Sequence, residues 1–579
     1  MGRPRFSLIM LAALLVSPAY IQAVQVIIST PGGNISVDVS HAGPTGLLVE
    51  PEPPIDGGFR PPTMFAAPLP IGSGARALGQ AGAFTAVADD ATAASWNPAG
   101  LTQLESPEVS VVYRYSARED THESQTGNLE AGQDQYHSSE LNYLSAVYPF
   151  LLNDRNVVVS ISYQESYDYT YEFNASFSGS NQESVHTTIN QAFFRTTTNS
   201  QSGPFLDVIT ITETTTDTES QIDQVLNSTL LSGIEFRQSG TIDAISPAFA
   251  FDVSPRFSLG ITINFYTDGA SRGNPIESTL VADYTGSSES VADINDTRIS
   301  TADISWEGEK YSGINNQITN AIAGTAITDP FTNKESSVQT NAYTVDGNYR
   351  EQNRTEDFYG INATLGALWA VNDKLALGAS VDLPWTGHGK QTKHINHQVS
   401  TFDSNLVQVA STSFVESQRR DVEYTFPLYW SVGGLWRWTD QFYTSIDVSQ
   451  TRWSDYSYKA DGKERINPIN GEPHSSSGLD DCWSARLGGE YLVMLSWTEI
   501  PLRGGLFWEQ RPATGDPDEY WGFSLGSGIS LGKVSRKALL DVAYIFEQGN
   551  NVLGSLLPGQ AIHSDVNKHQ LFVSAIWHF

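Results

Sequence analysis

The sequence predicts an all-β protein: a transmembrane antiparallel β-barrel of about fourteen strands, with an N-terminal plug inside its lumen. Three observations support this: strand-length segments of alternating apolar and polar residues, connections that alternate between short and long, and an aromatic C-terminal residue. In the last segment, every second residue counted back from Phe579 is apolar, beginning with Trp577. One face of this strand therefore meets an apolar phase.

Residues 1–23 have the pattern of an export signal. Two arginines precede an apolar run over residues 6–16, and small residues follow, so we expect cleavage after Ala23 or, as an alternative, after Ala19. The apolar run is too short to span a bilayer as a helix. The sequence thus predicts a cleaved signal peptide and a protein that leaves the cytoplasm.

The composition suits a membrane barrel better than a soluble protein. The chain has 13 Trp, 24 Tyr and 26 Phe, but only 17% charged residues, and after the export signal it has no apolar run long enough for a spanning helix. A net charge of -32 argues against nucleic-acid binding. The single cysteine, Cys482, excludes an intramolecular disulfide, and the neighbouring Asp480 and Asp481 favour a structural over a reactive thiol.

Two segments are expected between the signal and the first strand. Residues 24–70 form an N-terminal extension whose later part is rich in proline, as in an extended periplasmic spacer. Residues 71–106 are rich in Gly and Ala and are expected to form the plug, or hatch, because a large lumen must be filled or it becomes an open pore. Asp89 or Asp90 is expected to N-cap a short helix that breaks at Asn97.

The predicted barrel covers residues 107–579. In one segment, Tyr359 and Trp369 stand ten positions apart, a spacing that matches the distance between the two aromatic girdles of a membrane barrel. The predicted strands are 107–116, 139–150, 154–170, 242–253, 256–268, 357–371, 374–386, 421–438, 441–456, 483–493, 501–510, 518–532, 537–548 and 566–579.

The connections between these segments alternate in length. Short, turn-like ones such as Asn153-Asp154 and Asn372-Asp373 alternate with long polar ones near 171–241, 269–356 and 387–420. Outer-membrane barrels have short periplasmic turns and long extracellular loops, so we expect the C-terminus to be periplasmic. We expect the long loops to be flexible and solvated, with one possible amphipathic helix over residues 222–231.

Two acidic residues lie within predicted strands. Asp447 and Asp541 are flanked by apolar residues that point to the opposite face. A carboxylate that faces lipid near the middle of the membrane is costly, so both side chains should face the lumen. There we expect them to hold the plug, with Arg76 as a partner, in preference to touching a ligand.

The segment 72–101 reads GSGARALGQAGAFTAVADDATAASWNPAGL. It resembles the N-terminal hatch of the FadL/TodX (OMPP1) family of outer-membrane transporters for long-chain fatty acids and hydrocarbons. Weaker echoes occur near residues 247–252, 501–505 and 522–526. The chain departs from the family pattern in its longer loops and in residues 24–70. The hatch and gating residues that the resemblance implies are Gly79, Gly82, Asp89, Asp90, Asn97, Pro98 and Ala99.

No catalytic or metal-binding pattern stands out, so neither an enzyme nor a cofactor is expected. His388, His394 and His397 are irregularly spaced and no acidic ligands frame them, which argues against a metal site. The resemblance implies passive uptake of hydrophobic molecules through a hatch-gated barrel. In the family, release occurs laterally beside a strand kink, which in this chain would fall in segment 154–170.

The expected partners follow from this interpretation. They are a hydrophobic small molecule, outer-membrane lipids and lipopolysaccharide, and the barrel-assembly machinery, which would read Trp577 and Phe579 as an insertion signal. We expect a monomer in the outer membrane. The long polar loops leave open a surface adhesin, or a barrel like the shuttle proteins of type IX secretion. An aromatic pocket in the outer half of the lumen would favour transport, whereas a wide polar mouth would favour partner binding.

Overall fold

The structure is a computed structural model that describes residues 24–30, 33–39, 69–124, 129–203, 206–269, 275–311, 318–327, 331–469, 471–496, 498–513, 515–533, 536–552 and 562–579. The predicted signal peptide and most of the proline-rich spacer lie outside these residues. The described part of the N-terminal extension is a hairpin of β1 (Val24–Thr30) and β2 (Gly33–Val39), followed later by β3 (Leu69–Pro70).

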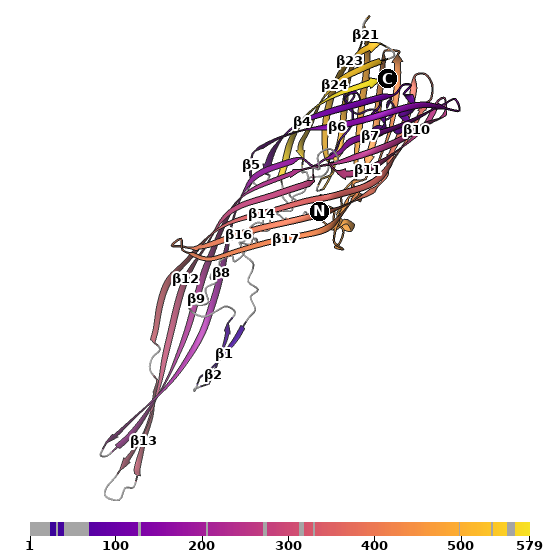
Figure 1. Cartoon of the computed structure of the whole chain (residues 1–579). Coiled ribbons are helices and arrows are strands. Elements are labelled where there is room, and N and C mark those ends of the chain that lie inside the picture. The colour runs from indigo at the N-terminus through magenta and orange to yellow at the C-terminus, as the bar shows by residue number, and fades with distance from the viewer. Residues whose placement is uncertain are drawn as a thin grey trace.

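A closed antiparallel barrel of fourteen strands forms the body of the protein (Figure 1). Each strand pairs with the next, and the last pairs with the first along its whole length, from Ile562↔Ser124 to His578↔Glu108. The wall strands are β4 (Glu108–Ser124), β6 (Gln133–Leu152), β7 (Arg155–Asp168), β10 (Thr241–Ser254), β11 (Phe257–Asp268), β14 (Phe331–Ala370), β15 (Leu375–Asp382), β18 (Tyr429–Thr439), β19 (Phe442–Thr451), β21 (Cys482–Met494), β22 (Glu499–Arg511), β23 (Asp518–Lys533), β24 (Arg536–Val552) and β25 (Ile562–His578).

The predicted fold class and the fourteen strands are confirmed. Two predicted segments, 374–386 and 421–438, are each divided in the structure, because Leu383-Pro384 and Pro427-Leu428 interrupt the strands. A proline lacks the N–H that a ladder needs, which explains why pairing stops at these positions.

The expectation of flexible long loops is wrong for most of their length. These stretches form a six-stranded sheet in the order β8-β9-β12-β14-β16-β17, which we call the extension and which leaves one end of the barrel (Figure 1). β14 belongs to both parts, with its first half in the extension and its second half in the wall. Threonine-rich sequence favours strands, and neighbouring strands supply the hydrogen bonds. The other strands of the extension are β8 (Tyr171–Gly203), β9 (Leu206–Ser239), β12 (Ile276–Tyr311), β16 (Trp385–Asp403) and β17 (Gln408–Phe426), with β5 (Leu129–Ala131), β13 (Ile318–Ile327) and β20 (Ser457–Ala460) pairing at its margins.

The helix expected over residues 222–231 is also wrong. These residues lie inside β9, where Ile222 pairs with Ile294 of β12 and with Thr187 of β8. Pairing on both sides satisfies the backbone of the strand. This outweighs the loose helical spacing of the apolar residues.

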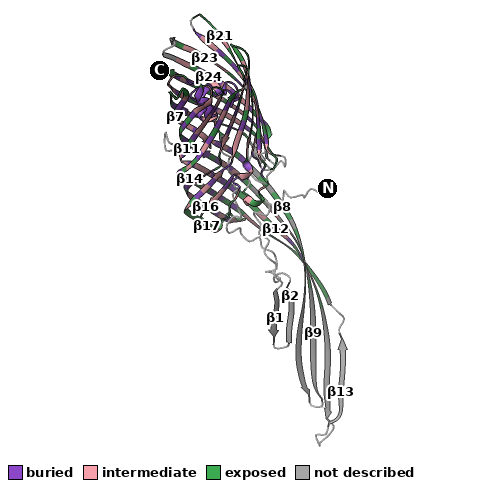
Figure 2. Cartoon of the chain, turned by 90° about the vertical axis from the view of Figure 1, so that its right-hand side faces the viewer, coloured by how far each residue is buried: buried purple, intermediate pink, exposed green. Residues whose placement is uncertain are grey.

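Figure 2 marks the exposed and the buried positions along the wall strands, and the large exposed side chains of the wall include many apolar ones, whereas the buried side chains are mixed. On β11 and its partner β14, Ile263, Phe265 and Ile361 are exposed to the membrane side, while Thr262 and Thr364 are buried towards the lumen. Trp577 and Phe579 are exposed at the end of β25 that bears the C-terminus.

The plug occupies the lumen near the end of the barrel with the short turns. It consists of short helices and turns: α2 (Ala75–Leu78), α3 (Ala93–Trp96) and the 3-10 helix η1 (Pro98–Gln103). Two further 3-10 helices, η2 (Trp453–Asp455) and η3 (His474–Ser476), lie between β19 and β21. No helix in the described ranges is long and apolar enough to cross a membrane.

Candidate functional site: the plug and the adjoining pocket

A belt of glycines on the inner wall lets the plug backbone touch the strands directly. A Cβ atom added to Gly378 would lie 2.2 Å from Thr85 O, and one added to Gly488 would lie 2.5 Å from Gln80 O. No real side chain fits at such distances, so these positions require glycine for close approach. The belt consists of Gly260, Gly366, Gly378, Gly488, Gly505 and Gly526.

The Asn97-Pro98-Ala99 segment lies in a slot of this belt. A Cβ on Gly260 would meet Pro98 C at 2.3 Å, and one on Gly366 would meet Asn97 Oδ1 at 2.2 Å. Asn97 donates hydrogen bonds from Nδ2 to Ala367 O of the wall at 3.0 Å and to Thr85 O of the plug at 2.8 Å. Its Oδ1 accepts from Ala99 N and so caps η1. Asn97 thus joins two parts of the plug to the wall.

Asp447 of β19 holds a second part of the plug. Its Oδ2 accepts hydrogen bonds from the backbone N–H groups of Phe84 and Thr85, both at 2.8 Å. Ser445, two residues earlier on the same face, donates to Ala83 O at 2.7 Å. The carboxylate therefore contacts the plug backbone and does not contact Arg76.

Asp541 reaches Arg76 through a chain of ion pairs. Arg503 Nη1 lies 2.5 Å from Asp541 Oδ1, and Arg503 Nε lies 2.6 Å from Glu490 Oε2. Glu490 in turn accepts from Arg76 Nε at 3.3 Å, and Arg76 pairs with Asp89 at 2.8 Å. The chain of charges fixes α2 to β21, β22 and β24.

A tight turn after α2 is held from two sides. The backbone of Gly79 packs against Gly526. Ala81 and Gly82 have positive φ angles of 57° and 74°, and the angle at Ala81 is strained because alanine carries a Cβ atom. Ser524 accepts from Ala81 N at 2.7 Å and donates to Gly79 O at 3.0 Å. Arg486 donates from Nη1 to Ala81 O at 3.0 Å and pairs through Nη2 with Glu509 at 2.9 Å.

Asp90 does not cap α3 as the sequence suggested. The helix begins at Ala93 after Thr92, and Asp90 Oδ1 accepts from both Thr92 N and Thr92 Oγ1, at 2.8 and 2.6 Å. Asp90 lies in the plug and not in a membrane-spanning strand. Burial raises the pKa of Asp90 to about 6, although Arg76 and the Thr92 hydrogen bonds act in the opposite direction.

A cavity of about 370 Å³ adjoins the plug on the side away from the short turns. Leu78, Ala81 and Trp96 of the plug form part of its wall. One side of the cavity is aromatic: Trp385 stacks on Tyr266 at 3.9 Å and on Phe426 at 4.2 Å between ring centroids. The other aromatic residues that line the cavity are Tyr167, Tyr169, Tyr171, Tyr429, Trp453, Trp483, Phe507, Tyr520 and Phe572.

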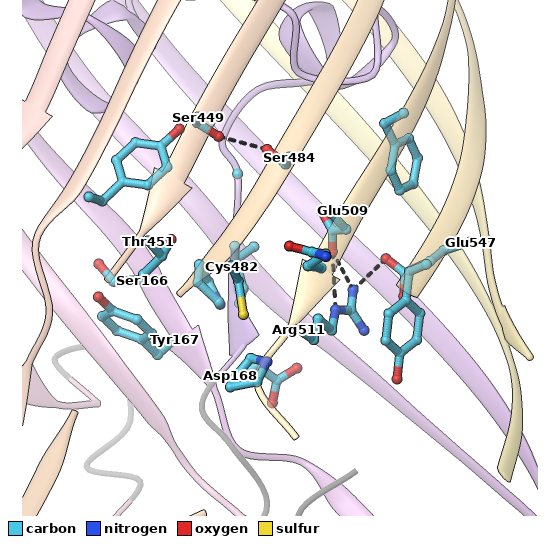
Figure 3. Close-up of a pocket in the computed structure, with 18 of the residues that line it drawn as sticks. Ser166, Tyr167, Asp168, Ser449, Thr451, Cys482, Ser484, Glu509, Arg511 and Glu547 are labelled. Atoms are coloured by element: carbon cyan, nitrogen blue, oxygen red, sulfur yellow. Dashed lines mark hydrogen bonds and ion pairs between the residues drawn. The ribbon is translucent and has the colours of Figure 1, made fainter. Parts of the chain in front are cut away.

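Another part of the lining is charged, and Arg511 pairs there with Glu509 and Glu547 (Figure 3). Arg511 lies between Glu509 and Glu547 and stacks over Tyr520 at 4.1 Å. Overall, four cations and five carboxylates line the cavity. Arg486 belongs to this lining and also binds the plug at Ala81, so one side chain connects cavity and plug.

The barrel wall is interrupted beside this cavity. β6 pairs with β7 only as far as Tyr143↔Gln164, and the rest of that edge of β7 pairs with β3 through Leu69↔Asp168 and Pro70↔Tyr167. Side chains from both banks of the gap bind the segment that fills it. Asn142 of β6 donates to Gly72 O at 3.0 Å, and Gln164 of β7 donates to Ile71 O at 3.3 Å.

We call residues 69–72 the strap. The strap lies at the end of β7 away from the short turn Asn153-Asp154. Arg114 of β4 crosses the same gap, pairing with Glu165 at 2.6 Å and Asp168 at 2.9 Å.

Several of these residues had no signal in the sequence. Glu490 and Arg503 lie in ordinary alternating strands, and the belt glycines look like any others, because their role depends on contacts with residues hundreds of positions away. His394 and His397 point to opposite faces of β16 because they are three positions apart along a strand. Within the described ranges, no group of three potential metal ligands is found.

Comparisons with known proteins give one family. A family model described as outer membrane protein transport protein (OMPP1/FadL/TodX) matches residues 238–544. A search of curated proteins finds no match. Similar solved structures include a Pseudomonas aeruginosa FadL homologue at 13% identity, covering 89% of this chain and 99% of that one with a TM-score of 0.44. The Ralstonia pickettii toluene transporter TbuX has 12% identity, coverage of 88% and 98%, and a TM-score of 0.40. The Pseudomonas putida toluene transporter TodX has 11% identity, with 89% of this chain and 100% of that one covered and a TM-score of 0.41.

Proposed function

The chain belongs to the OMPP1/FadL/TodX family of outer membrane transport proteins, and on this premise we propose that it carries hydrophobic compounds passively across the outer membrane. The plug, residues 71–106, acts as the gate. Long-chain fatty acids and hydrocarbons are the substrate classes proposed. The protein works as a transporter and not as an enzyme, and it needs no cofactor.

One observation carries the proposal: the aromatic cavity and the plug share residues. Trp96 and Leu78 belong to the plug and line the cavity, and Arg486 touches both. A ligand in the cavity is therefore in contact with the element that blocks the barrel. Displacing Arg486 from Ala81 O would release the strained turn after α2.

The cavity recognises mainly the apolar body of its ligand. The cations Arg486 and Arg511 already pair with Glu509 and Glu547, so an incoming anion would have to break those pairs. The aromatic side of the cavity, by contrast, presents an apolar face without such a cost, with Trp385 held at its centre between the rings of Tyr266 and Phe426. An alkyl or aromatic portion of the ligand is expected to lie against this face.

We place the exit route at the gap between β6 and β7. The family resemblance implies lateral release beside the third strand, and β7 is the third strand of this barrel. The strap covers the gap by two backbone pairs and by hydrogen bonds from Asn142 and Gln164. Movement of the strap would connect the cavity with the membrane.

The proposed orientation places the short turns and the C-terminus in the periplasm and the extension outside the cell. Trp577 and Phe579 would then be the insertion signal read by the barrel-assembly machinery, and lipids and lipopolysaccharide would surround the wall. A single barrel encloses one complete cavity and plug, so a monomer suffices for transport.

Native mass spectrometry of the detergent-purified chain, followed by lipid extraction, tests this function. We expect hydrophobic molecules to co-purify with the wild type and to be lost from Trp385→Ala, which removes the centre of the aromatic stack. Trp436→Ala, on the exposed outer face of β18, is the matched control and should retain them. A wild-type barrel that binds no fatty acid or hydrocarbon would contradict the proposal.

A second candidate function is binding of a partner at the cell surface. The extension favours it, because transport needs only the barrel, the plug and the cavity. Pull-down of a defined protein by the full chain, lost when the extension is altered but unaffected by Trp385→Ala, would support this alternative.

A further inference from the structure

The extension is an open sheet with two edges. β17 forms one edge, where residues 408–421 pair with β16 on one side, and β20 takes up the other side only from Val422 onward. β8 forms the other edge. From Ser178 onward it forms a ladder with β9 alone among the described strands, and β2 lies near part of β8 without pairing with it. Each edge therefore presents a row of backbone N–H and C=O groups without strand partners in the described part of the chain.

The β17 edge exposes several apolar side chains among polar ones and lacks the usual protection. Val409, Phe414 and Val415 are 49%, 49% and 72% exposed, and the adjoining turn exposes Leu406 and Val407. Residues 408–418 contain no proline, glycine or lysine, and one charge, Glu416. Natural edge strands are normally short, twisted by bulges, or broken by proline or lysine. A long exposed edge strand without these devices is a surface that pairs with another chain.

The directions of the two edge strands suit each other. β8 follows β7 and runs away from the barrel, whereas β17 follows β16 and runs back towards it. Copies of the chain in one membrane share the same orientation. When two copies stand side by side, β17 of one and β8 of the next are therefore antiparallel, which is the more stable pairing. Pairing of β17 with β17 in the same membrane would be parallel.

The charges of the two sides also suit each other. β9 has six carboxylates and one arginine, and β12 has eight carboxylates and two cations, so the sheet behind the β8 edge is strongly acidic. β16 and β17 together have four cations and four carboxylates, including Arg419 and Arg420 on the edge strand. Two β8 sides would repel each other, whereas a β8 side and a β17 side would not.

We propose that the β17 edge binds the β8 edge of a second copy of this chain, so that the extension sheets of neighbouring barrels join into one continuous sheet. Such a head-to-tail contact leaves one free edge at each end. It therefore builds rings or rows of barrels and not only dimers. The free edge of β17 extends over roughly 45 Å, long enough for a substantial ladder. The contact requires neither the plug nor the cavity, and it revises the expectation of a monomer.

Mass measurement of the full chain in native outer-membrane vesicles and in lipid nanodiscs tests the proposal. The β17 variant Val409→Glu/Val415→Glu adds acid to that edge, and the β8 variant Ser180→Glu/Ser184→Glu adds acid to the other, so that the two altered edges also repel each other. The control Asn396→Glu/Gln398→Glu puts two glutamates on exposed positions of β16, an interior strand of the same hairpin. Heat modifiability on gels verifies that every variant forms the barrel.

We expect the wild type and the control to form complexes larger than a dimer. The association constant of each edge variant alone should be about tenfold lower. An equal mixture of the two edge variants should form dimers but nothing larger, because one intact β17 edge meets one intact β8 edge. If the β8 variant alone still associated fully, pairing of β17 with itself would replace this proposal. A wild type that stays monomeric at high density in the membrane would overturn it. Ligand binding is unaffected by either result, so failure here differs from failure of the transport function.

Discussion

Gly260 on β11 and Gly366 on β14 are direct cross-strand partners, and the backbone of Pro98 and Ala99 and the side-chain oxygen of Asn97 lie in the space that their missing side chains leave. The slot is part of the wall and not of the plug. The position of the plug is therefore set by residues that belong to the barrel, and the plug is fixed only when both parts are in place.

Filling the slot should unseat the plug. Gly366→Ala places a Cβ 2.2 Å from Asn97 Oδ1, and we expect a destabilisation of about 1–3 kcal/mol by overpacking, together with larger ion conductance in planar bilayers. Gly434→Ala is the control, because a Cβ there meets its nearest neighbour only at 3.7 Å. Equal conductance of the two variants would show that the slot does not hold the plug.

Removing one member of the chain of ion pairs should lower the unfolding free energy more than removing two paired members together. Arg503→Met leaves Asp541 buried without its cation, and we expect a loss of about 3–5 kcal/mol in unfolding free energy. The double variant Arg503→Met/Asp541→Leu should recover a large part of this loss. Unfolding in urea, followed by tryptophan fluorescence, measures the difference. A double variant less stable than the single one would contradict this explanation.

Asp447 should control the middle of the plug. Asp447→Ala leaves the N–H groups of Phe84 and Thr85 without an acceptor, which costs about 1–3 kcal/mol for each group that stays buried. Hydrogen exchange of the peptide containing residues 83–88 should become faster, while exchange in β23 stays unchanged. Ser445→Ala removes a single hydrogen bond, to Ala83 O, and should have a smaller effect.

The stability of the plug should depend on pH through Asp90. Its pKa in the folded plug, about 6, lies above the ordinary value of 3.8. The folded state therefore binds the proton more tightly, and the stability of the plug should fall as pH rises from about 4 to about 6 and then level off. Asp90→Asn should remove this part of the pH dependence. Protection of residues 83–96 from exchange, measured against pH, gives the result, and an unchanged profile in the variant would exclude Asp90 as the cause.

Loosening the strap should speed ligand exchange. Asn142→Ala/Gln164→Ala removes the two hydrogen bonds that tie residues 71 and 72 to the banks of the gap. We expect association and dissociation rates of a fluorescent fatty acid to rise together, with little change in affinity, because the cavity wall is otherwise intact. The control Asn264→Ala, at a polar position of β11 that also lines the cavity, should leave the rates closer to those of the wild type. Unchanged rates in the double variant would show that the ligand does not leave through the gap between β6 and β7.

The barrel could be predicted because each wall strand carries its own evidence. Alternation in β11 and the aromatic spacing between Tyr359 and Trp369 are local patterns that lipid and lumen impose on any such strand. The positions of Asp447 and Asp541 followed from the same reasoning. Their partners did not, because Phe84 N and Arg503 become neighbours only after the wall closes.

The extension could not be predicted from alternation, because its strands are polar on much of both faces. β9 and β12 read as loops, yet their threonines and their mutual pairing, such as Ile222↔Ile294, make them strands. A polar strand is specified mainly by its neighbours, and a single sequence contains no record of which neighbours meet. The same reason explains why the two open edges were not foreseen.

Pairing of β25 with β4 has a consequence for the order in which the molecule folds. The residues that hold Arg76 and Ala81 lie more than 400 positions later in the chain, at Arg486, Glu490 and Ser524. The plug precedes all of these partners in the chain, and it has no wall to pack against until the last third of the chain is present. Its enclosure must therefore coincide with the pairing of β25 and β4, the step that closes the barrel.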